Sequence, residues 1–180
     1  MKAAAKAMTS SKLRTSVEFD AAHFLPNYEG KCKNMHGHRW LVKIEIGTNA
    51  KRPNGMIVDF TVIKNHINEN YDHRILNKCP FPPITIQNLQ SGESVDLAAT
   101  PFKWGPFDNP TAENIAEKLA TDIFGLLPKA EGYDIGWNGG WNREYVQVEL
   151  FESPKSSVVA IVHGGRDRWS DGAKPHDGDK

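Results

Sequence analysis

Three histidines lie where two short segments could bring them together. His23 ends the segment SVEFDAAH (16–23), and His36 and His38 open the segment HGHRWLVKIEI (36–46). Both segments alternate apolar and polar residues with a period of two, which predicts β-strands with one buried face. The three imidazoles share that face, so pairing of the two strands would bring them within reach of a single metal ion. Zinc accepts three such nitrogens and, in catalytic sites, keeps a fourth position for water or substrate.

Two other interpretations of these histidines stay open from the residue types alone. A single histidine on an apolar face, such as His23, is most often a hydrogen-bonded core residue. A closed structural zinc site would need a fourth protein ligand, and Cys32 in the loop between the two segments could supply its sulfur. The spacing by itself therefore leaves a catalytic metal centre and a metal-stapled hairpin as alternatives.

Cys32 also has the surroundings of a reactive thiol. It lies between Lys31 and Lys33, and nearby positive charge favours the thiolate form. Cys79, in the segment NKCPFPP, has no charged neighbour on its C-terminal side that would do the same, which favours an inert thiol. Because a free cysteine is most often a small buried hydrophobe, the two lysines shift the interpretation of Cys32 only modestly.

Three acidic or basic residues could move protons or bind a ligand. Asp72 and His73 are adjacent in YDHRILN, and a carboxylate can fix the tautomer of an imidazole and raise its basicity; alternatively, Asp72 only solvates the end of a helix. Glu152 takes an inward position in the segment YVQVELFE (145–152), among valine and leucine. A carboxylate there must be paired or must serve a ligand, such as two adjacent N–H groups of a heterocycle. A register shift after Phe151 would instead turn it outward.

The remaining patterns predict an α+β domain. Segments 59–71 and 109–127 carry apolar residues at helical spacing, and the second opens with the start signals Asn-Pro-Thr. A further segment, 156–162, alternates like a strand. The order is strand, strand, helix, helix, strand, strand, which predicts a four-stranded antiparallel sheet with both helices packed on one face.

Length and charge limit the possible functions. The 180 residues fit one domain, which we place at 14–163 with flexible termini at 1–13 and 164–180. Lys and Arg number 22 and Asp and Glu number 22, so no net field recruits nucleic acid or a membrane surface. No segment reaches the roughly 20 apolar residues of a membrane span, and the two cysteines indicate reduced thiols. We expect a cytoplasmic protein, with an insertion at 79–108 that holds five of the 11 prolines.

Six segments in chain order resemble the family of 6-pyruvoyl-tetrahydropterin and 6-carboxytetrahydropterin synthases. They are FDAAH, CKNMHGHRW, GMIVDF, DHRILN, NPTAENIA and ELFES, and the resemblance covers roughly residues 16 to 163. It implies a tunnelling fold (T-fold), in which such subunits assemble into an oligomeric β-barrel, commonly a homo-hexamer made of two trimers. Assembly of this kind would cover the two unpaired edge strands that a four-stranded sheet exposes.

The resemblance also implies a role for each candidate residue. The family's zinc ligands are matched by His23, His36 and His38. Its proton-transfer residues are matched by Cys32, Asp72 and His73. The residues that bind or approach the pterin ring are matched by Glu152, Thr111 and Glu113. The implied cofactor is Zn²⁺, and the implied partner is a small pterin triphosphate.

The activity implied is conversion of 7,8-dihydroneopterin triphosphate to 6-carboxytetrahydropterin, acetaldehyde and triphosphate, a step toward queuosine-type deazapurine nucleosides. The four-residue step from Cys32 to His36 resembles the compact loop of the bacterial carboxy-forming enzymes, whereas the pyruvoyl-forming enzymes carry a longer loop. Two alternatives are retained. One is a 6-pyruvoyl-tetrahydropterin synthase acting on the same substrate. The other is a non-catalytic module in which zinc holds a hairpin and Glu152 captures a purine or pterin.

Overall fold

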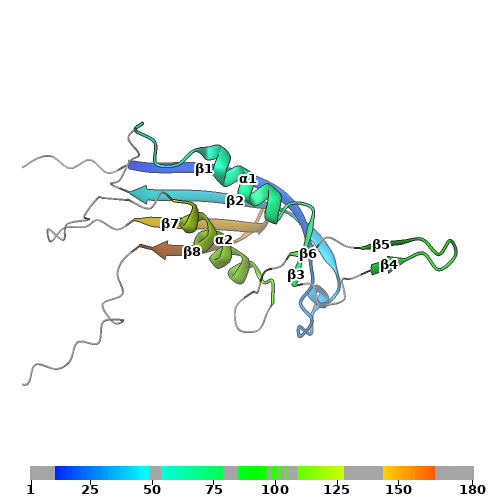
Figure 1. The fold of residues 1–180 in the computed structure, drawn as a ribbon. Coiled ribbons are helices and arrows are strands. Elements are labelled where there is room, and N and C mark those ends of the chain that lie inside the picture. Colours follow the sequence, from blue (N-terminus) through cyan, green and yellow to red (C-terminus); the bar gives the residue numbers. More distant parts are fainter. Residues whose placement is uncertain are drawn as a thin grey trace, which may run out of the picture.

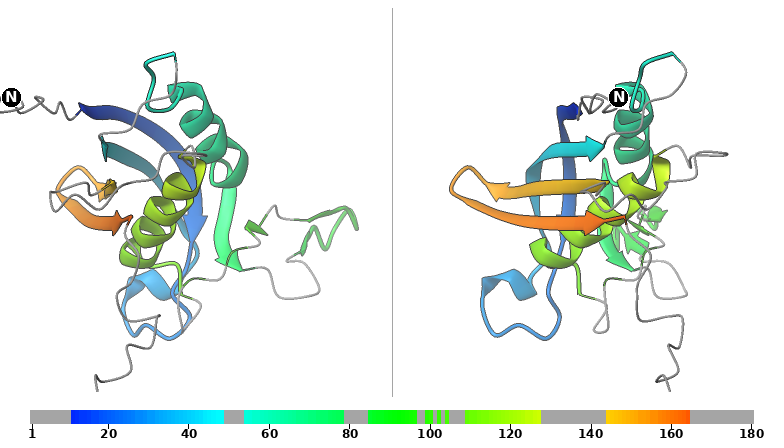
Figure 2. Two further views of the ribbon diagram at one scale, coloured as in Figure 1. Left: turned by 60° about the vertical axis from the view of Figure 1, so that its left-hand side comes forward. Right: turned by 90° about the vertical axis from the view of Figure 1, so that its left-hand side faces the viewer.

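A curled sheet with two helices on one face forms the body of the computed structural model (Figures 1 and 2). The structure describes residues 11–48, 54–78, 85–96, 99–100, 102, 104, 109–127 and 144–164. Within these residues the main sheet has the strand order β6-β3-β1-β2-β7-β8. Its strands are β1 (Ser11–His23), β2 (His36–Thr48), β3 (Arg74–Lys78), β6 (Ala99–Thr100), β7 (Tyr145–Ser153) and β8 (Ser156–His163). The helices are α1 (Phe60–Asn70) and α2 (Ala112–Leu126).

The four strands expected from the period-two pattern are present and pair antiparallel. β1 pairs with β2 along its whole length, β2 pairs with β7, and β7 pairs with β8. β1 begins at Ser11, three residues before the predicted start of the domain. The sheet is nevertheless mixed, because β3 adds to the edge of β1 in parallel and β6 adds in parallel to β3. These two short strands were not predicted from the sequence.

The core lies between the helices and the sheet. The buried face of β2 presents Trp40, Val42 and Ile44, and the helices contribute apolar stripes of their own. The buried helical residues are Ile63 and Ile67 of α1 and Ile115, Ala116, Leu119, Ala120 and Ile123 of α2. Removing such side chains from water is the main stabilising term for a domain of this size. Neither described helix is long and apolar enough to cross a bilayer.

Side-chain caps fix where each helix begins. Asp59 Oδ1 accepts a hydrogen bond from the backbone N–H of Thr61 at 2.8 Å, and Thr111 Oγ1 accepts one from the N–H of Asn114 at 3.3 Å. These acceptors satisfy N–H groups that a helix start leaves without an intrahelical partner. Phe60, the first residue of α1, has the helical spacing of the buried Ile63 and Ile67 but is 46% exposed.

The predicted insertion at 79–108 contains both a projecting and an integrated part. β4 (Thr85–Gln87) and β5 (Ser94–Asp96) form a hairpin that extends away from the body (Figure 2), and all six strand residues are exposed. In contrast, β6 joins the main sheet, and Trp104 is fully buried with its indole N–H donating to the carbonyl of Leu76. Cys79, residues 1–10 and residues 165–180 lie outside the described residues.

Candidate active site

The three histidines meet at one end of the sheet. Antiparallel pairing sets His23 directly opposite His36, and places His38 opposite Ala21, the next inward residue of β1. The ring centroids of the three imidazoles are 4.6 to 5.2 Å apart. Side chains two residues apart on a strand share a face, so the alternation that makes these segments strands also gathers the imidazoles.

Glu152 completes a group of four potential metal ligands. Its Oε1 atom lies 3.3 Å from His23 Nε2 and 3.4 Å from His38 Nε2. One ligand atom from each of the four residues, His36 included, falls within 4.8 Å of the others. Cys32 is not a member of this group. The structure therefore does not support the stapled hairpin in which Cys32 is the fourth ligand.

The hydrogen bonds of two of the histidines orient their free nitrogens into the group. The Nδ1 atom of His23 lies 2.8 Å from the carbonyl oxygen of Pro110, and that of His36 lies 2.8 Å from the carbonyl oxygen of Asn34. Since a carbonyl can only accept, each Nδ1 carries a proton, and in the neutral ring the lone pair is then on Nε2. Both rings are therefore held in the tautomer that binds a metal through Nε2.

Two nitrogen atoms of the group have no hydrogen-bond partner. Among the described residues, the buried Nε2 atoms of His23 and His38 lack a hydrogen-bond partner. Buried polar atoms in proteins are nearly always paired. Burial, the main cause, lowers the pKa of both imidazoles, while the nearby carboxylate of Glu152 acts to raise it. Neutral imidazoles are the form that coordinates metals. Three imidazole nitrogens and a carboxylate oxygen thus fit a divalent metal ion.

Asp72 and His73 form a bonded pair directly after α1. The Oδ2 atom of Asp72 lies 2.8 Å from Nδ1 of His73, and Oδ1 accepts from the backbone N–H of Asp20 at 2.9 Å. Burial acts to raise the pKa of Asp72, but hydrogen bonds from Asp20 N–H and His73 hold it below its usual range. His73 adopts a positive φ of 55°, which is uncommon for a non-glycine residue. Strained backbone of this kind clusters at functional sites.

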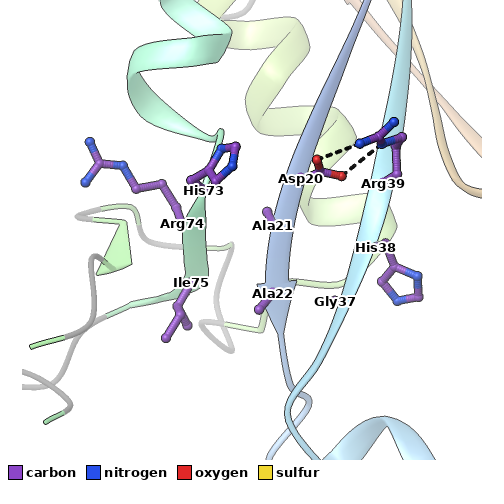
Figure 3. Close-up of a pocket in the computed structure, with 9 residues that line it drawn as sticks. All are labelled: Asp20, Ala21, Ala22, Gly37, His38, Arg39, His73, Arg74 and Ile75. Carbon is purple, nitrogen blue, oxygen red and sulfur yellow. Dashed lines mark hydrogen bonds and ion pairs between the residues drawn. The ribbon is translucent and has the colours of Figure 1, made fainter. Parts of the chain in front are cut away.

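The Asp72–His73 pair is separated from the metal-ligand group within one chain. Figure 3 shows β1 and β2 between His73 and the ring of His38, consistent with the strand order β3-β1-β2. An open cleft of about 560 Å³ is lined by residues of β1, β2 and β3, with His38 and His73 among them. In the same lining, Arg39 forms a two-point ion pair with Asp20, at 3.0 and 3.1 Å. The His73 side chain is 80% exposed. One copy of the chain therefore does not place the Asp72–His73 pair and the metal-ligand group against the same substrate atom.

The remaining candidate residues are not members of the metal-ligand group. Cys32 is partly exposed in a 3-10 turn (Lys31–Lys33), and its carbonyl accepts from the backbone N–H of Leu25 at 2.8 Å. The hydroxyl of Thr111 caps α2, and Glu113 is exposed in the first turn of that helix, beside the groove between α2 and β8. The start of α2 nevertheless adjoins the metal-ligand group, because Pro110 precedes Thr111.

Sequence reasoning did not find the backbone carbonyls that orient the histidines. Asn34 lies in the loop before β2, and Pro110 is distant in sequence from His23. The Asn-Pro-Thr start signal located the beginning of α2, but no pattern in it indicated contact with a histidine.

Comparison with known proteins assigns the chain. The model of the 6-pyruvoyl tetrahydropterin synthase family matches residues 12–161. The chain belongs to this family of enzymes.

Relatives within the 6-pyruvoyl tetrahydropterin synthase family agree with this assignment. The chain is 28% identical over 151 residues to the 6-carboxy-5,6,7,8-tetrahydropterin synthase of Rickettsia conorii, covering 82% of this chain and 97% of that protein. It is 42% identical over 146 residues to a Pyrococcus horikoshii protein provisionally given the same name, covering 81% and 86%.

The fold agrees as well. The structure of the Plasmodium falciparum 6-pyruvoyl tetrahydropterin synthase superposes with a TM-score of 0.54 at 18% identity, covering 86% of this chain and 98% of that one. The predicted T-fold subunit, two helices on one face of a curled sheet, is confirmed.

Proposed function

We propose that this chain is a zinc-dependent lyase that converts 7,8-dihydroneopterin triphosphate to 6-carboxytetrahydropterin, acetaldehyde and triphosphate. The observation that carries the proposal is the group of His23, His36, His38 and Glu152, whose two buried Nε2 atoms lack hydrogen-bond partners. The names of the bacterial and archaeal relatives support the carboxy-forming reaction. A role in queuosine-type nucleoside synthesis and a cytoplasmic location remain predictions.

The three histidines are the proposed metal ligands. Zinc bound by them would act as a Lewis acid on the hydroxyl and carbonyl oxygens of the substrate side chain. The protein's own contribution begins with orientation, because the carbonyls of Pro110 and Asn34 hold two of the rings with Nε2 inward. Burial keeps His23 and His38 neutral, so protons do not compete for those lone pairs at neutral pH.

Proton transfer is assigned to Cys32 and His73. The Nδ1 atom of His73 is bonded to the carboxylate of Asp72, which leaves Nε2 as the atom that accepts or returns a proton. Cys32 would take the second proton position at its sulfur.

Glu152 is assigned to the pterin ring. Its carboxylate can accept two adjacent N–H groups of the heterocycle, and such an anchor would keep the reacting carbons in reach of the proton donors. The position of Oε1 beside two imidazoles also allows a fourth metal ligand, so the proposal requires the Glu152→Gln test described below.

A homo-oligomer is part of the proposal, expected as a hexamer of two trimers. The separation of His73 from the metal-ligand group supports a site completed by a second copy. β8 supports it too, because among the described residues this strand pairs only with β7 and exposes Val159 and Ile161 at 52% and 49%. Uncovered apolar edge strands are normally protected by pairing or burial. Sedimentation analysis tests the prediction, and a stable monomer would contradict it.

The decisive experiment is product identification. The metal-loaded protein is incubated with 7,8-dihydroneopterin triphosphate, the pterin product is identified by mass, and acetaldehyde is trapped as a hydrazone, with Cys32→Ala as the control. We expect 6-carboxytetrahydropterin and acetaldehyde. Accumulation of 6-pyruvoyl-tetrahydropterin without acetaldehyde would establish the alternative synthase, and binding without turnover would establish the non-catalytic module.

A further inference from the structure

A buried amide on β3 is used by none of the roles assigned above. Asn77 is 6% exposed and ends the DHRILN segment that begins with Asp72 and His73. A buried polar side chain must be hydrogen-bonded to be tolerated. Its partners therefore indicate what it does.

Both partners belong to the backbone of one residue. The N–H of Phe24 donates to Asn77 Oδ1 at 2.9 Å, and Asn77 Nδ2 donates to the carbonyl of Phe24 at 2.8 Å. The parallel ladder between β1 and β3 consists of only two pairs, Ala21 with Arg74 and Ala22 with Ile75. The carboxamide thus continues the pairing of β3 with the chain beyond the end of β1, in place of backbone groups.

Phe24 connects two parts of the candidate active site. It directly follows His23, whose ring is buried in the metal-ligand group. It directly precedes Leu25, whose N–H donates to the carbonyl of Cys32 at 2.8 Å. A displacement of Phe24 would be transmitted along the chain in both directions.

We propose that Asn77 is a positioning residue that holds His23 and the thiol of Cys32 in place. It acts through the backbone of Phe24 and ties both to the strand that begins after the Asp72–His73 pair. The catalytic meaning of this role rests on the proposed function, but the geometric role does not. Small displacements of reacting groups cost large factors in rate. Turnover should therefore depend on the fixed backbone of Phe24, which links the proposed metal ligand His23 to the thiol of Cys32.

The test compares Asn77→Asp with Asn70→Asp, both in a Cys79→Ala background. Asn77→Asp keeps an acceptor for the Phe24 N–H but replaces the donor with an oxygen that faces the Phe24 carbonyl. Asn70 is the matched control because its Nδ2 likewise donates to a backbone carbonyl, that of His66 at 2.8 Å, at the end of α1. Each variant removes one side-chain N–H that donates to a partly buried backbone carbonyl.

The main readout is the rate of alkylation of Cys32 by iodoacetamide, which requires neither substrate nor metal. Losing one buried hydrogen bond shifts a local opening equilibrium by about tenfold. We expect Asn77→Asp to raise the Cys32 rate about tenfold and Asn70→Asp to leave it within about twofold of the parent. Equal rates in Asn77→Asp and the parent would overturn the proposal, as would equal increases in both variants.

Two further measurements separate this role from general destabilisation and from the proposed function. In the metal-loaded protein, Asn77→Asp should lose zinc to a chelator about tenfold more readily, and its kcat should fall about tenfold with little change in KM. If neither the variants nor the parent turn over the pterin, the proposed function fails. The alkylation rates still test the geometric role of Asn77, because that assay uses no substrate.

The unmodified protein provides a test that no folding defect can obscure. The amides of Phe24 and Leu25 lie outside β1, yet both should exchange their hydrogens at least about 100-fold more slowly than an unstructured loop. Fast exchange at both amides would show that the Asn77 contact does not hold this backbone, and would overturn the proposal.

Discussion

Removing two of the three clustered imidazoles should abolish metal-dependent stabilisation. The change is the double variant His36→Ala, His38→Ala, which leaves only His23 and Glu152 of the four grouped ligands. A ligand that binds only the folded state stabilises it by RT ln(1 + [L]/Kd). With zinc at about 100 times its Kd, that is about 2.7 kcal/mol for the parent.

The expected shift in melting temperature follows from the chain length. For a protein of this size, 1 kcal/mol corresponds to about 2–4 °C in Tm, so zinc should raise the Tm of the parent by about 5–11 °C. If the lost ligands weaken binding at least about 100-fold, the same zinc concentration gives the double variant about 0.4 kcal/mol, or less than about 2 °C. Comparing each protein with and without zinc cancels the direct effect of the substitutions on folding.

The assay is thermal unfolding followed by circular dichroism, after stripping with a chelator and again after adding back zinc, with metal content measured on the same samples. The control is His66→Ala, His163→Ala, which removes two histidines outside the group: His66 contacts Asp122 at 3.4 Å, and His163 is exposed on β8. The control should behave as the parent does, with about one zinc per chain. An equal zinc-dependent shift in both double variants would refute the assignment of the ligands.

Three further predictions test individual residues. Cys32→Ala should retain zinc and fold but lose most turnover, with Cys79→Ala nearly silent in the same activity assay; loss of zinc from Cys32→Ala would revive the structural-site interpretation. Glu152→Gln should keep its metal and weaken binding of a pterin analogue by about 10- to 100-fold in calorimetry, whereas an emptied metal site would make Glu152 a ligand. Hydrogen bonds from Lys12, Tyr145 and Arg14 lower the pKa of Glu45 to about 2, below the roughly 4.3 of an unfolded chain. The stabilisation by ionised Glu45 is present above about pH 4.3 and is lost as the pH falls toward 2. Over that range the free energy of unfolding of the parent should fall by about 1 kcal/mol more than that of Glu45→Gln, after allowance for solvent screening. Identical acid profiles in urea titrations would contradict this.

The parts of the fold that local patterns determine were predictable. The alternation in β1, β2 and β7 follows from one buried sheet face, and the stripes of α1 and α2 follow from helical spacing. The same alternation placed His36 and His38 on one face with His23, so the convergence of the imidazoles could be inferred before any coordinates.

Features that depend on contacts distant in sequence were not predictable. β3 and β6 are short strands held by few parallel pairs, and neither RILNK nor two residues of β6 carry a periodic signal. The distance of Glu152 from the imidazoles depends on the register between β2 and β7, which sets Leu41 opposite Phe151 and cannot be read from either strand alone. The sequence indicated that Glu152 points inward, but not that it reaches His23 and His38.

The positions of the four grouped ligands along the chain also affect how the protein is made. His23, His36 and His38 all belong to the first hairpin, β1 with β2, and emerge together early in synthesis. Pro110, whose carbonyl orients His23, and Glu152 in β7 follow much later. Non-local pairings of this kind form slowly because distant segments must first be brought together. A nascent chain can therefore hold three imidazoles on one hairpin before the carboxylate exists, and the complete group arises only when β7 docks beside β2.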